Sequence, residues 1–219
     1  MTGMPASSAS SSVPASPPRR SQAERSAATR EALLDATIAC LVEDGYANTT
    51  TSRVAERAGV SRGAHLHHFQ TRNALVAAAV ERLAERRHAD LLVAAERLPS
   101  GRERLVQGLD LVWSGYASPL YQAALDLWTH ARTDPELRER LAPIERDLDR
   151  QTQQVTRRLF GDVAEQPGFD HLIELAAATM RGLALLDTLH PGAGRNRKQW
   201  PYCRERLVDM LEAARPSAG

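Results

Sequence analysis

The chain has 219 residues, of which 42% are hydrophobic and 25% charged, and its formal net charge is +1. This composition is typical of a globular protein of one domain or two small ones, and the balanced charge excludes a basic field over the whole molecule, so any surface for nucleic acid must be local. The two cysteines, Cys40 and Cys203, form no CxxC motif and no apolar run approaches the roughly 18 residues of a membrane span, which indicates a cytoplasmic protein without membrane contact.

The N-terminal stretch is rich in Ser, Ala and Pro and has no apolar core. It lacks the hydrophobic segment of a secretory signal, and it cannot bury enough surface to fold. We therefore expect residues 1–21 to be a disordered tail and residues 215–219 to be a disordered end.

Helical periodicity begins at residue 22. In "REALLDATIACLVEDGY", Leu34, Ile38 and Leu41 recur at a spacing of three and four residues, which predicts one apolar stripe on an amphipathic helix. Gly45 follows and should end this helix, because glycine accepts the left-handed conformation.

Three further helix starts follow in the next 26 residues. Thr50 or Thr51 can cap a short helix that Gly59 should end. Ser61 can cap the helix "RGAHLHHF", and Thr71 can cap a much longer one. Small polar residues at these positions satisfy backbone amides that the first helical turn leaves without partners.

Beyond Pro99, capping residues and prolines indicate where further helices begin. Residues 100–103 read as a capping box, and a cap followed by proline begins helices at residues 118–119 and 134–135. Pro143 should kink the helix that begins at Pro135, and Gly161 should end it.

Two helices complete the predicted fold. Residues 169–190 are the most apolar span, residues 191–199 read as a loop, and Pro201 should open a last helix. One face of that helix carries Cys203, Leu207, Met210 and Leu211. Because no stretch alternates as a strand does, we predict an all-α fold with about nine helices.

Three histidines in four positions, His65, His67 and His68, raise the question of a metal site in "AGVSRGAHLHHFQTR". Zinc needs three or four converging ligands, often including Cys or a carboxylate. Residues 57–80 contain neither Asp nor Glu, and no cysteine is near in sequence. We therefore expect no metal and no cofactor here.

The same stretch fits a helix-turn-helix. The glycine of "ERAGVSRG" permits the left-handed turn, Val60 fills the angle between the helices, and small Ala55 lets them approach. The absence of acidic residues suits a helix in the major groove, since phosphate would repel a carboxylate. Thr50, Thr51 and Arg72 stand at helix starts that suit phosphate contacts.

Residues 30–76 resemble the DNA-binding head of the TetR (tetracycline repressor) family of bacterial transcriptional regulators. The matching segments are "TREALLDATIACLVEDGYANTTTSRVAERAGVS" and "RGAHLHHFQTRNAL". They include Gly45 and Tyr46 at the end of the first helix, and the "HHF" that closes the recognition helix. Many relatives carry a hydrophobic residue and then Tyr before this "HHF", where the chain has His65 and Leu66; we expect His65 to face outward.

The resemblance implies a DNA-binding domain over residues 22–71 and an effector-binding and dimerisation domain over residues 72–214. Its recognition helix would begin at Arg62, with His67 and His68 at the DNA backbone or, for His68, packed against the first helix. The candidate DNA-binding residues are Thr50, Thr51, Ser52, Arg62, Gly63, Ala64, His65, Leu66, His67, His68 and Arg72.

In the larger domain the resemblance implies a small, apolar effector bound between the middle helices, although an aromatic stripe is also typical of a core. The candidate ligand-binding residues are Trp113, Tyr116, Tyr121, Leu125, Trp128, Met180 and Leu183, with Asp110, Asp126 and His130 as polar groups that could orient the ligand. The last two long helices would form a homodimer interface through Ala176, Ala177, Ala178, Gly182, Ala184, Leu185, Leu186, Leu207 and Leu211.

The sequence thus predicts a dimeric regulator, a repressor that an effector releases from a palindromic operator in double-stranded DNA. Two alternatives stay open: an all-α enzyme that uses the histidines or His130 with Asp126, and a helical protein–protein adaptor. The enzyme is disfavoured because the sequence has no HExxH, no nucleophile elbow and no phosphate loop.

Overall fold

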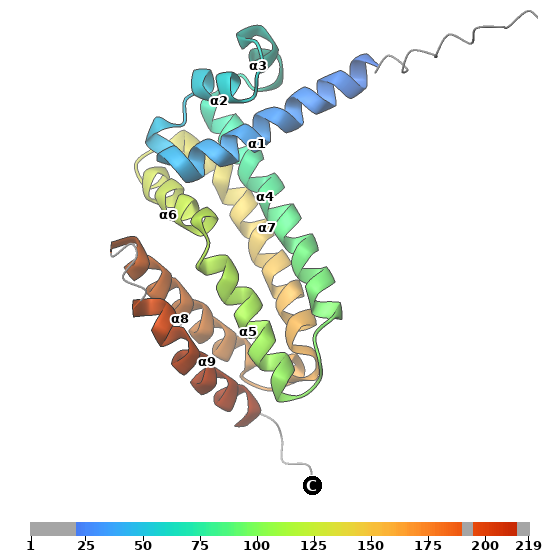
Figure 1. Cartoon of the computed structure of the whole chain (residues 1–219), viewed down its shortest axis with the longest axis vertical. Helices are drawn as coiled ribbons and strands as arrows, with labels where there is room; N and C mark the ends of the chain where they lie inside the picture. Colours follow the sequence, from blue (N-terminus) through green and yellow to red (C-terminus); the bar gives the residue numbers. More distant parts are fainter. Residues whose placement is uncertain (1–20, 190–194, 214–219) are drawn as a thin grey trace, which may run out of the picture.

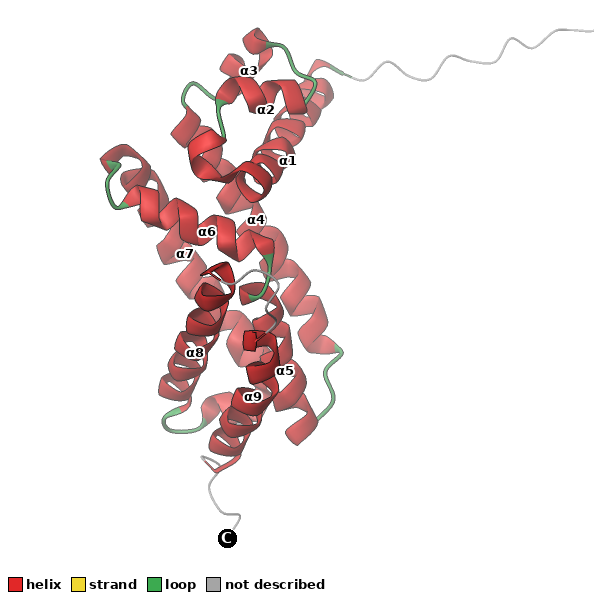
Figure 2. Cartoon of the chain, turned by 60° about the vertical axis from the view of Figure 1, so that its left-hand side comes forward, coloured by secondary structure: helices red, strands yellow, loops and turns green. Residues whose placement is uncertain are grey.

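The computed structural model describes residues 21–189 and 195–213. Within these ranges the chain forms nine α-helices and one short 3-10 helix, with no strand, which confirms the predicted all-α class (Figures 1 and 2). The helices are α1 (Gln22–Asn48), α2 (Thr51–Arg57), α3 (Arg62–His68), α4 (Arg72–Glu96), α5 (Arg102–Tyr116), α6 (Pro119–Ala131), α7 (Pro135–Phe160), η1 (Gly161–Glu165), α8 (Phe169–Leu189) and α9 (Arg195–Ala213).

Most helices begin where the sequence predicts. The side chains of Thr50, Ser61, Thr71, Ser118 and Asp134 each accept a hydrogen bond from the backbone amide three residues further on. Each bond satisfies an amide that would otherwise have no partner in the first turn. The expected tail 1–21 lies outside the described residues up to its last member, Ser21, which caps α1. The expected end 215–219 also lies outside them.

One predicted cap and one predicted helix start are wrong. Helix α5 begins after Gly101, whose φ of 70° and ψ of −150° suit glycine, and no side chain caps it, so residues 100–103 form no capping box. Pro201 lies inside α9 and does not open it. The neighbouring Trp200 is buried and stacks on Trp113 with ring centroids 4.9 Å apart, a contact that holds this part of α9 against α5.

Helices α1, α2 and α3 form a small head at one end of the molecule (Figure 1). Its buried core includes residues from the start of α4 as well, so the head and the larger body share one helix. The core residues are Leu33, Leu34, Ala36, Cys40, Val54, Phe69, Leu75 and Ala79. Further along the same helix pair, Arg82 of α4 is buried and forms ion pairs with Glu31 and Asp35 of α1.

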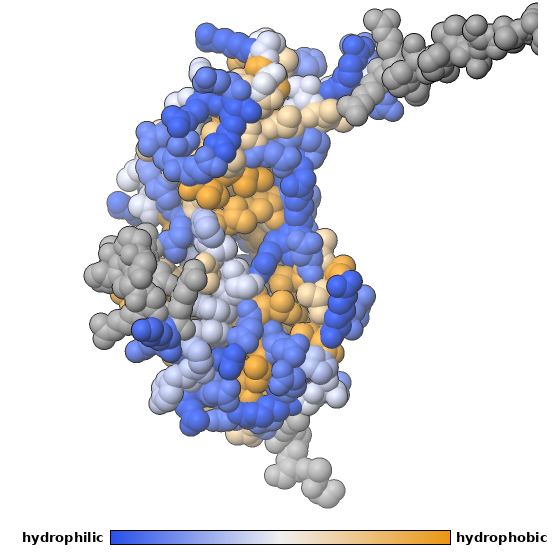
Figure 3. Space-filling model, in the orientation of Figure 1, coloured by the Kyte–Doolittle hydropathy of each residue, from blue (hydrophilic) through white to orange (hydrophobic). Residues whose placement is uncertain are grey.

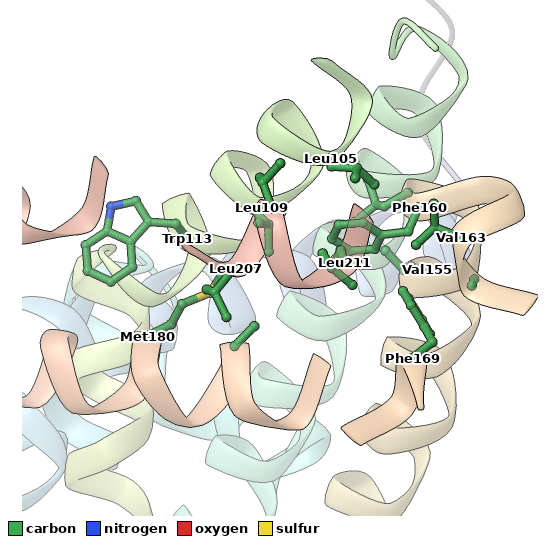
Figure 4. Packing of buried hydrophobic residues seen from close by; sticks show 14 of the residues in the cluster. Leu105, Leu109, Trp113, Val155, Phe160, Val163, Phe169, Met180, Leu207 and Leu211 are labelled. Atoms are coloured by element: carbon green, nitrogen blue, oxygen red, sulfur yellow. The ribbon is translucent and has the colours of Figure 1, made fainter. Parts of the chain in front are cut away.

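The body is built on the long pair α4 and α7, which run side by side in the same direction from the head. Helices α5 and α6 pack against α7, and α8 and α9 pack against each other and against α5 (Figure 2). Leucine, aromatic and methionine side chains from α5, α7, α8 and α9 interdigitate in one continuous core (Figure 4). None of the described helices is long and apolar enough to cross a lipid bilayer.

The structure divides the residues that were expected to form a dimer interface. Ala176, Leu207 and Leu211 are buried within the chain itself and belong to the body core, and Ala184 is also buried. The large apolar side chains that α8 and α9 leave exposed are Leu175, Leu185, Leu186, Tyr202 and Met210. Leu185 and Leu186 of the expected interface therefore lie on the outward apolar face, whereas Leu207 and Leu211 of the same set pack inside the chain.

This division predicts different outcomes for two charge substitutions on α9. Leu207→Glu places a carboxylate in the core and should reduce the free energy of unfolding by about 3 kcal/mol or more. Met210→Glu, at a position that is 41% exposed in the single chain, keeps the carboxylate outside this core and should cost much less. Urea unfolding followed by circular dichroism measures both, and equal stability losses would contradict the assigned core.

Candidate nucleic-acid interface and ligand site

Helices α2 and α3 meet at a tight turn. Gly59 adopts a φ of 64°, and the Val60 amide donates to the Ala55 carbonyl over 2.9 Å. Ala55 is buried and Val60 packs against the head core, as the sequence predicts for a helix-turn-helix. The turn fixes the orientation of α3 on the surface of the head.

One face of α3 points away from the head core. Arg62, Gly63, Leu66 and His67 are exposed, and Leu66 keeps 49% of its surface in contact with solvent. Ala64 and His68 are half-buried. Because residues 57–80 include no acidic residue, no carboxylate of this segment opposes a phosphate backbone.

The start of α2, which precedes α3 in the motif, carries further candidate DNA-binding residues. Thr50 and Ser52 are exposed, whereas Thr51 is half-buried. The Thr50 hydroxyl accepts the Arg53 amide and so orders the first turn. Amides at a helix N-terminus favour an approaching anion.

The expectation that His65 faces outward is wrong. Its side chain is 2% exposed in the head, and its Nε2 atom has no hydrogen-bond partner. Burial, together with the neighbouring His68, lowers the pKa of His65, so the ring is neutral at pH 7. Position 65 lies on the face of α3 that packs against the head, so the side chain is buried although it is polar.

The three histidines do not converge on one point. His65 is buried, whereas His67 is exposed and its ring lies 5.3 Å from that of His68, edge to face. In the described ranges, no group of three His, Cys, Asp or Glu side chains is placed to hold a metal ion.

Arg72 is directed into the protein, contrary to the expected phosphate contact. Its Nε donates to the Thr49 carbonyl over 2.6 Å, another guanidinium nitrogen donates to the Tyr46 carbonyl, and the guanidinium lies 3.8 Å from the centre of the Tyr46 ring. Hydrogen bonds to carbonyls at the end of α1 and a cation–π contact therefore compete with any phosphate for this group.

The junction between head and body centres on Tyr46. Its backbone amide donates to the Asp126 carboxylate of α6 over 2.7 Å, and its hydroxyl donates to Asn73 over 2.8 Å. The His130 ring lies 4.9 Å from the Tyr46 ring, and His130 Nδ1 is 3.2 Å from Asp126. These contacts place Asp126 and His130 at the head, so they do not line a ligand site as expected.

Gly45 makes this junction possible. It interrupts α1 with a φ of 75° and a ψ of 169°, a region that essentially only glycine adopts. A Cβ atom at this position would lie 3.2 Å from the Asp126 carboxylate. The predicted break at Gly45 is confirmed, and its structural role is the close approach of α6 to the end of α1.

Several of the candidate ligand-binding residues belong to the packed core. Trp113, Met180 and Leu183 are at most 9% exposed, and Trp113 is stacked on Trp200. Asp110 accepts hydrogen bonds from the Trp200 indole and Arg204, each over 2.7 Å. These groups tie α5 to α8 and α9.

The other candidate aromatics form a separate group at the edge of the core. Tyr116, Tyr121 and Leu125 are half-buried, and Trp128 is 38% exposed. The Trp128 indole donates to Glu145 of α7. Sequence reasoning missed Glu145, because it is one of many acidic residues on α7 and only the fold places it beside the tryptophan.

A second feature that the sequence did not reveal is an apolar hollow between head and body (Figure 3). It lies below α1 and is bounded by α4 and α6. Its lining residues are Ile38, Leu41, Val42, Ala79, Val80, Leu83, Leu120, Ala123, Ala124 and Leu127.

Comparison with known proteins finds a family whose DNA-binding head is similar to this one. Residues 33–79 match the family described as "Bacterial regulatory proteins, tetR family". The matched span begins and ends with residues of the head core, Leu33 and Ala79. The head of the chain is therefore similar to that of the tetR family.

Individual relatives extend the likeness beyond the head. The HTH-type transcriptional regulator CymR of Pseudomonas putida is 37% identical over 57% of this chain and 61% of its own length. An uncharacterized HTH-type transcriptional regulator of Mycobacterium tuberculosis is 26% identical over 89% of this chain and 96% of its own. The solved structure of a proposed transcriptional regulator from Pseudomonas aeruginosa PAO1 has a TM-score of 0.63 at 27% identity, over 84% of this chain and 90% of that one.

The buried histidine should make the head sensitive to acid. Because the folded pKa of His65 is lowered, the unfolded chain binds a proton first, and stability is lost as the pH falls below the ordinary histidine pKa of about 6.5. His65→Leu should raise the free energy of unfolding by about 1 kcal/mol at neutral pH, because it removes an unpaired buried nitrogen, and by more in mild acid.

Thermal unfolding at neutral pH and at about pH 5.5 measures this effect. His67→Leu is the control, since His67 is exposed and should change stability by less than about 0.5 kcal/mol. If His65→Leu is no more stable than the unchanged chain at either pH, the account of His65 is wrong.

Proposed function

We propose that the chain is a dimeric DNA-binding transcriptional regulator, a repressor that a small-molecule effector releases from a palindromic operator. The observation that carries the proposal is the exposed, acid-free face of α3, held by the Gly59 turn, in a head that is similar to that of the tetR family. An α-helix presented in this way fits the major groove of B-DNA.

The proposed contacts are of two kinds: some read the base sequence, and others position the head on the phosphate backbone. Arg62 stands at the first turn of α3, where its guanidinium can donate to guanine N7 and O6, and Gly63 lets the backbone approach the bases. His67 and the N-terminus of α2 at Thr50 would meet phosphates. His65 is excluded from this set by its burial, and Arg72 by its contacts with Tyr46 and Thr49.

A homodimer would supply the second half-site. A single head is too small for high specific affinity, and two heads related by a twofold axis match a palindrome. The exposed apolar side chains of α8 and α9, Leu185 and Met210 among them, support an interface on this face. Its complement would be the same face of a second copy.

Helix α6 is the proposed link between effector and DNA. Tyr121, Leu125 and Trp128 follow one face of α6, and Asp126 lies on another, where it holds the Tyr46 amide. An effector that shifts α6 would loosen or redirect the contact with α1 and change the spacing of the two heads.

The proposal includes the remaining expectations from the sequence. The DNA-binding domain spans residues 22–71, with the first turns of α4 completing its core, and the effector-binding and dimerisation region spans residues 72–214, in a cytoplasmic protein that is not an enzyme. The relatives named as transcriptional regulators support this choice over an all-α enzyme or an adaptor.

The DNA-binding proposal predicts a specific loss in Arg62→Ala. A good bidentate contact contributes about 1–3 kcal/mol of base discrimination, so this variant should relax sequence preference at one position in each half-site. The measurement is a binding titration at several salt concentrations, with DNA from upstream of the protein's own gene and with a scrambled duplex.

Arg146→Ala is the control for this titration, because Arg146 is exposed on α7, outside the head. It should bind both duplexes as the unchanged chain does. Equal weakening of both duplexes by Arg62→Ala would assign Arg62 to phosphate, and the absence of any preference in the unchanged chain would refute sequence-specific binding.

The coupling proposal predicts different effects for two substitutions of Asp126. Asp126→Ala leaves the Tyr46 amide without its acceptor, whereas Asp126→Asn keeps an oxygen at the same place. Asp126→Ala should therefore speed hydrogen exchange at Tyr46 by about tenfold or more and weaken operator binding, while Asp126→Asn should stay close to the unchanged chain. Identical exchange rates in the two variants would show that this bond does not hold the junction.

A further inference from the structure

The outward face of α3 carries a large apolar side chain. Leu66 is 49% exposed, and among the described residues of α1, α2 and α3 it is the only large apolar side chain that is exposed. Helix α3 lies at the outer end of the head (Figure 1). Because His65 and the helix-ending Phe69 are buried, the helical register directs Leu66 away from the core.

The surface beside Leu66 is open. Gly63 lies three residues earlier and therefore on the same side of the helix, and a Cβ atom at this position would meet nothing within 4 Å. Glycine weakens a helix relative to alanine, and no packing within the described chain requires it here. An open glycine next to an exposed leucine suits a partner that approaches α3 closely from outside.

The neighbouring side chains indicate what kind of partner this is. Arg62, one helical turn before Leu66, is exposed and is charged at pH 7, and His67 is also exposed. Residues 57–80 contain no carboxylate. One apolar side chain thus lies on a face without negative charge, and its complement is a negatively charged surface that carries isolated apolar groups.

The major groove of DNA is such a surface, and it offers one apolar group. Thymine presents its C5-methyl group there, whereas the edges of adenine, guanine and cytosine present hydrogen-bonding groups. A leucine against those polar edges would remove water from them and return no hydrogen bond. Against the thymine methyl group, it would remove apolar surface from water on both partners.

We propose that Leu66 reads a thymine in each operator half-site by packing on its C5-methyl group. The inference rests on the proposed function and adds to it a specificity-determining residue that makes no hydrogen bond. Arg62 and Leu66 are four residues apart, which is about 6 Å along the helix axis and close to two base-pair steps. The thymine therefore lies within about two base pairs of the guanine proposed for Arg62.

The first experiment selects DNA from a randomised duplex pool with the full chain. The unchanged chain should enrich guanine and thymine within about two base pairs of each other. Leu66→Ala should lose the thymine and keep the guanine, whereas Leu66→Met, which keeps a large apolar side chain, should retain both. Val93→Ala is the matched control, because Val93 is 50% exposed on α4, outside the head core, and it should also retain both.

The second experiment removes only the methyl group. Uracil replaces the selected thymine in both half-sites, which keeps the base pair and the O4 acceptor. The affinity of the unchanged chain should fall by about threefold for each half-site and by about tenfold for the dimer. Where cytosine stands at this position, 5-methylcytosine should strengthen binding by a similar factor, since its methyl group occupies the same place. In Leu66→Ala both ratios should be below about twofold.

The proposal is overturned if the unchanged chain binds the thymine and uracil duplexes equally, or if Leu66→Ala has the same ratio of thymine to uracil affinity as the unchanged chain. Failure of the proposed function is a different result, in which the unchanged chain enriches no sequence from the pool. Circular dichroism checks that each variant is folded, and the uracil comparison on the unchanged chain decides the question even if a variant is not.

Discussion

The contact between the Asp126 carboxylate and the Tyr46 amide is the constraint on which the arrangement of head and body depends. It forms because Gly45 breaks α1 in a conformation closed to other residues and leaves space where a Cβ atom would meet the carboxylate. Around it, Arg72 covers the Tyr46 ring and Asn73 joins the Tyr46 hydroxyl to Asp134, the cap of α7. Four helices are thus fixed to one aromatic residue.

This arrangement gives α6 two roles. The helix is short, yet one side meets the end of α1 and another carries Trp128, whose indole donates to Glu145 of α7. Rigid helices transmit small displacements along their whole length, so a change at Trp128 and a change at Asp126 are parts of the same movement.

The sequence predicts the fold well where local chemistry decides the structure. Caps such as Ser61 and Asp134 and breaks such as Gly59 depend on neighbours in the chain, and the structure confirms them. Prediction fails where a tertiary contact overrides a local preference, as Trp200 does for Pro201 and as core packing does for His65. The pairing of Trp128 with Glu145 joins residues 17 positions apart on different helices, and no periodicity reveals it.

The sharing of α4 between head and body has a consequence for modular exchange. Leu75 and Ala79 lie in the first turns of α4 but complete the core of the head, and the family match also ends at residue 79. A chimaera joined at residue 71 would separate the head from part of its own core, while a junction beyond residue 79 keeps that core whole. A head that is to be transferred intact must therefore include the first turns of α4, beyond the residues proposed to contact DNA.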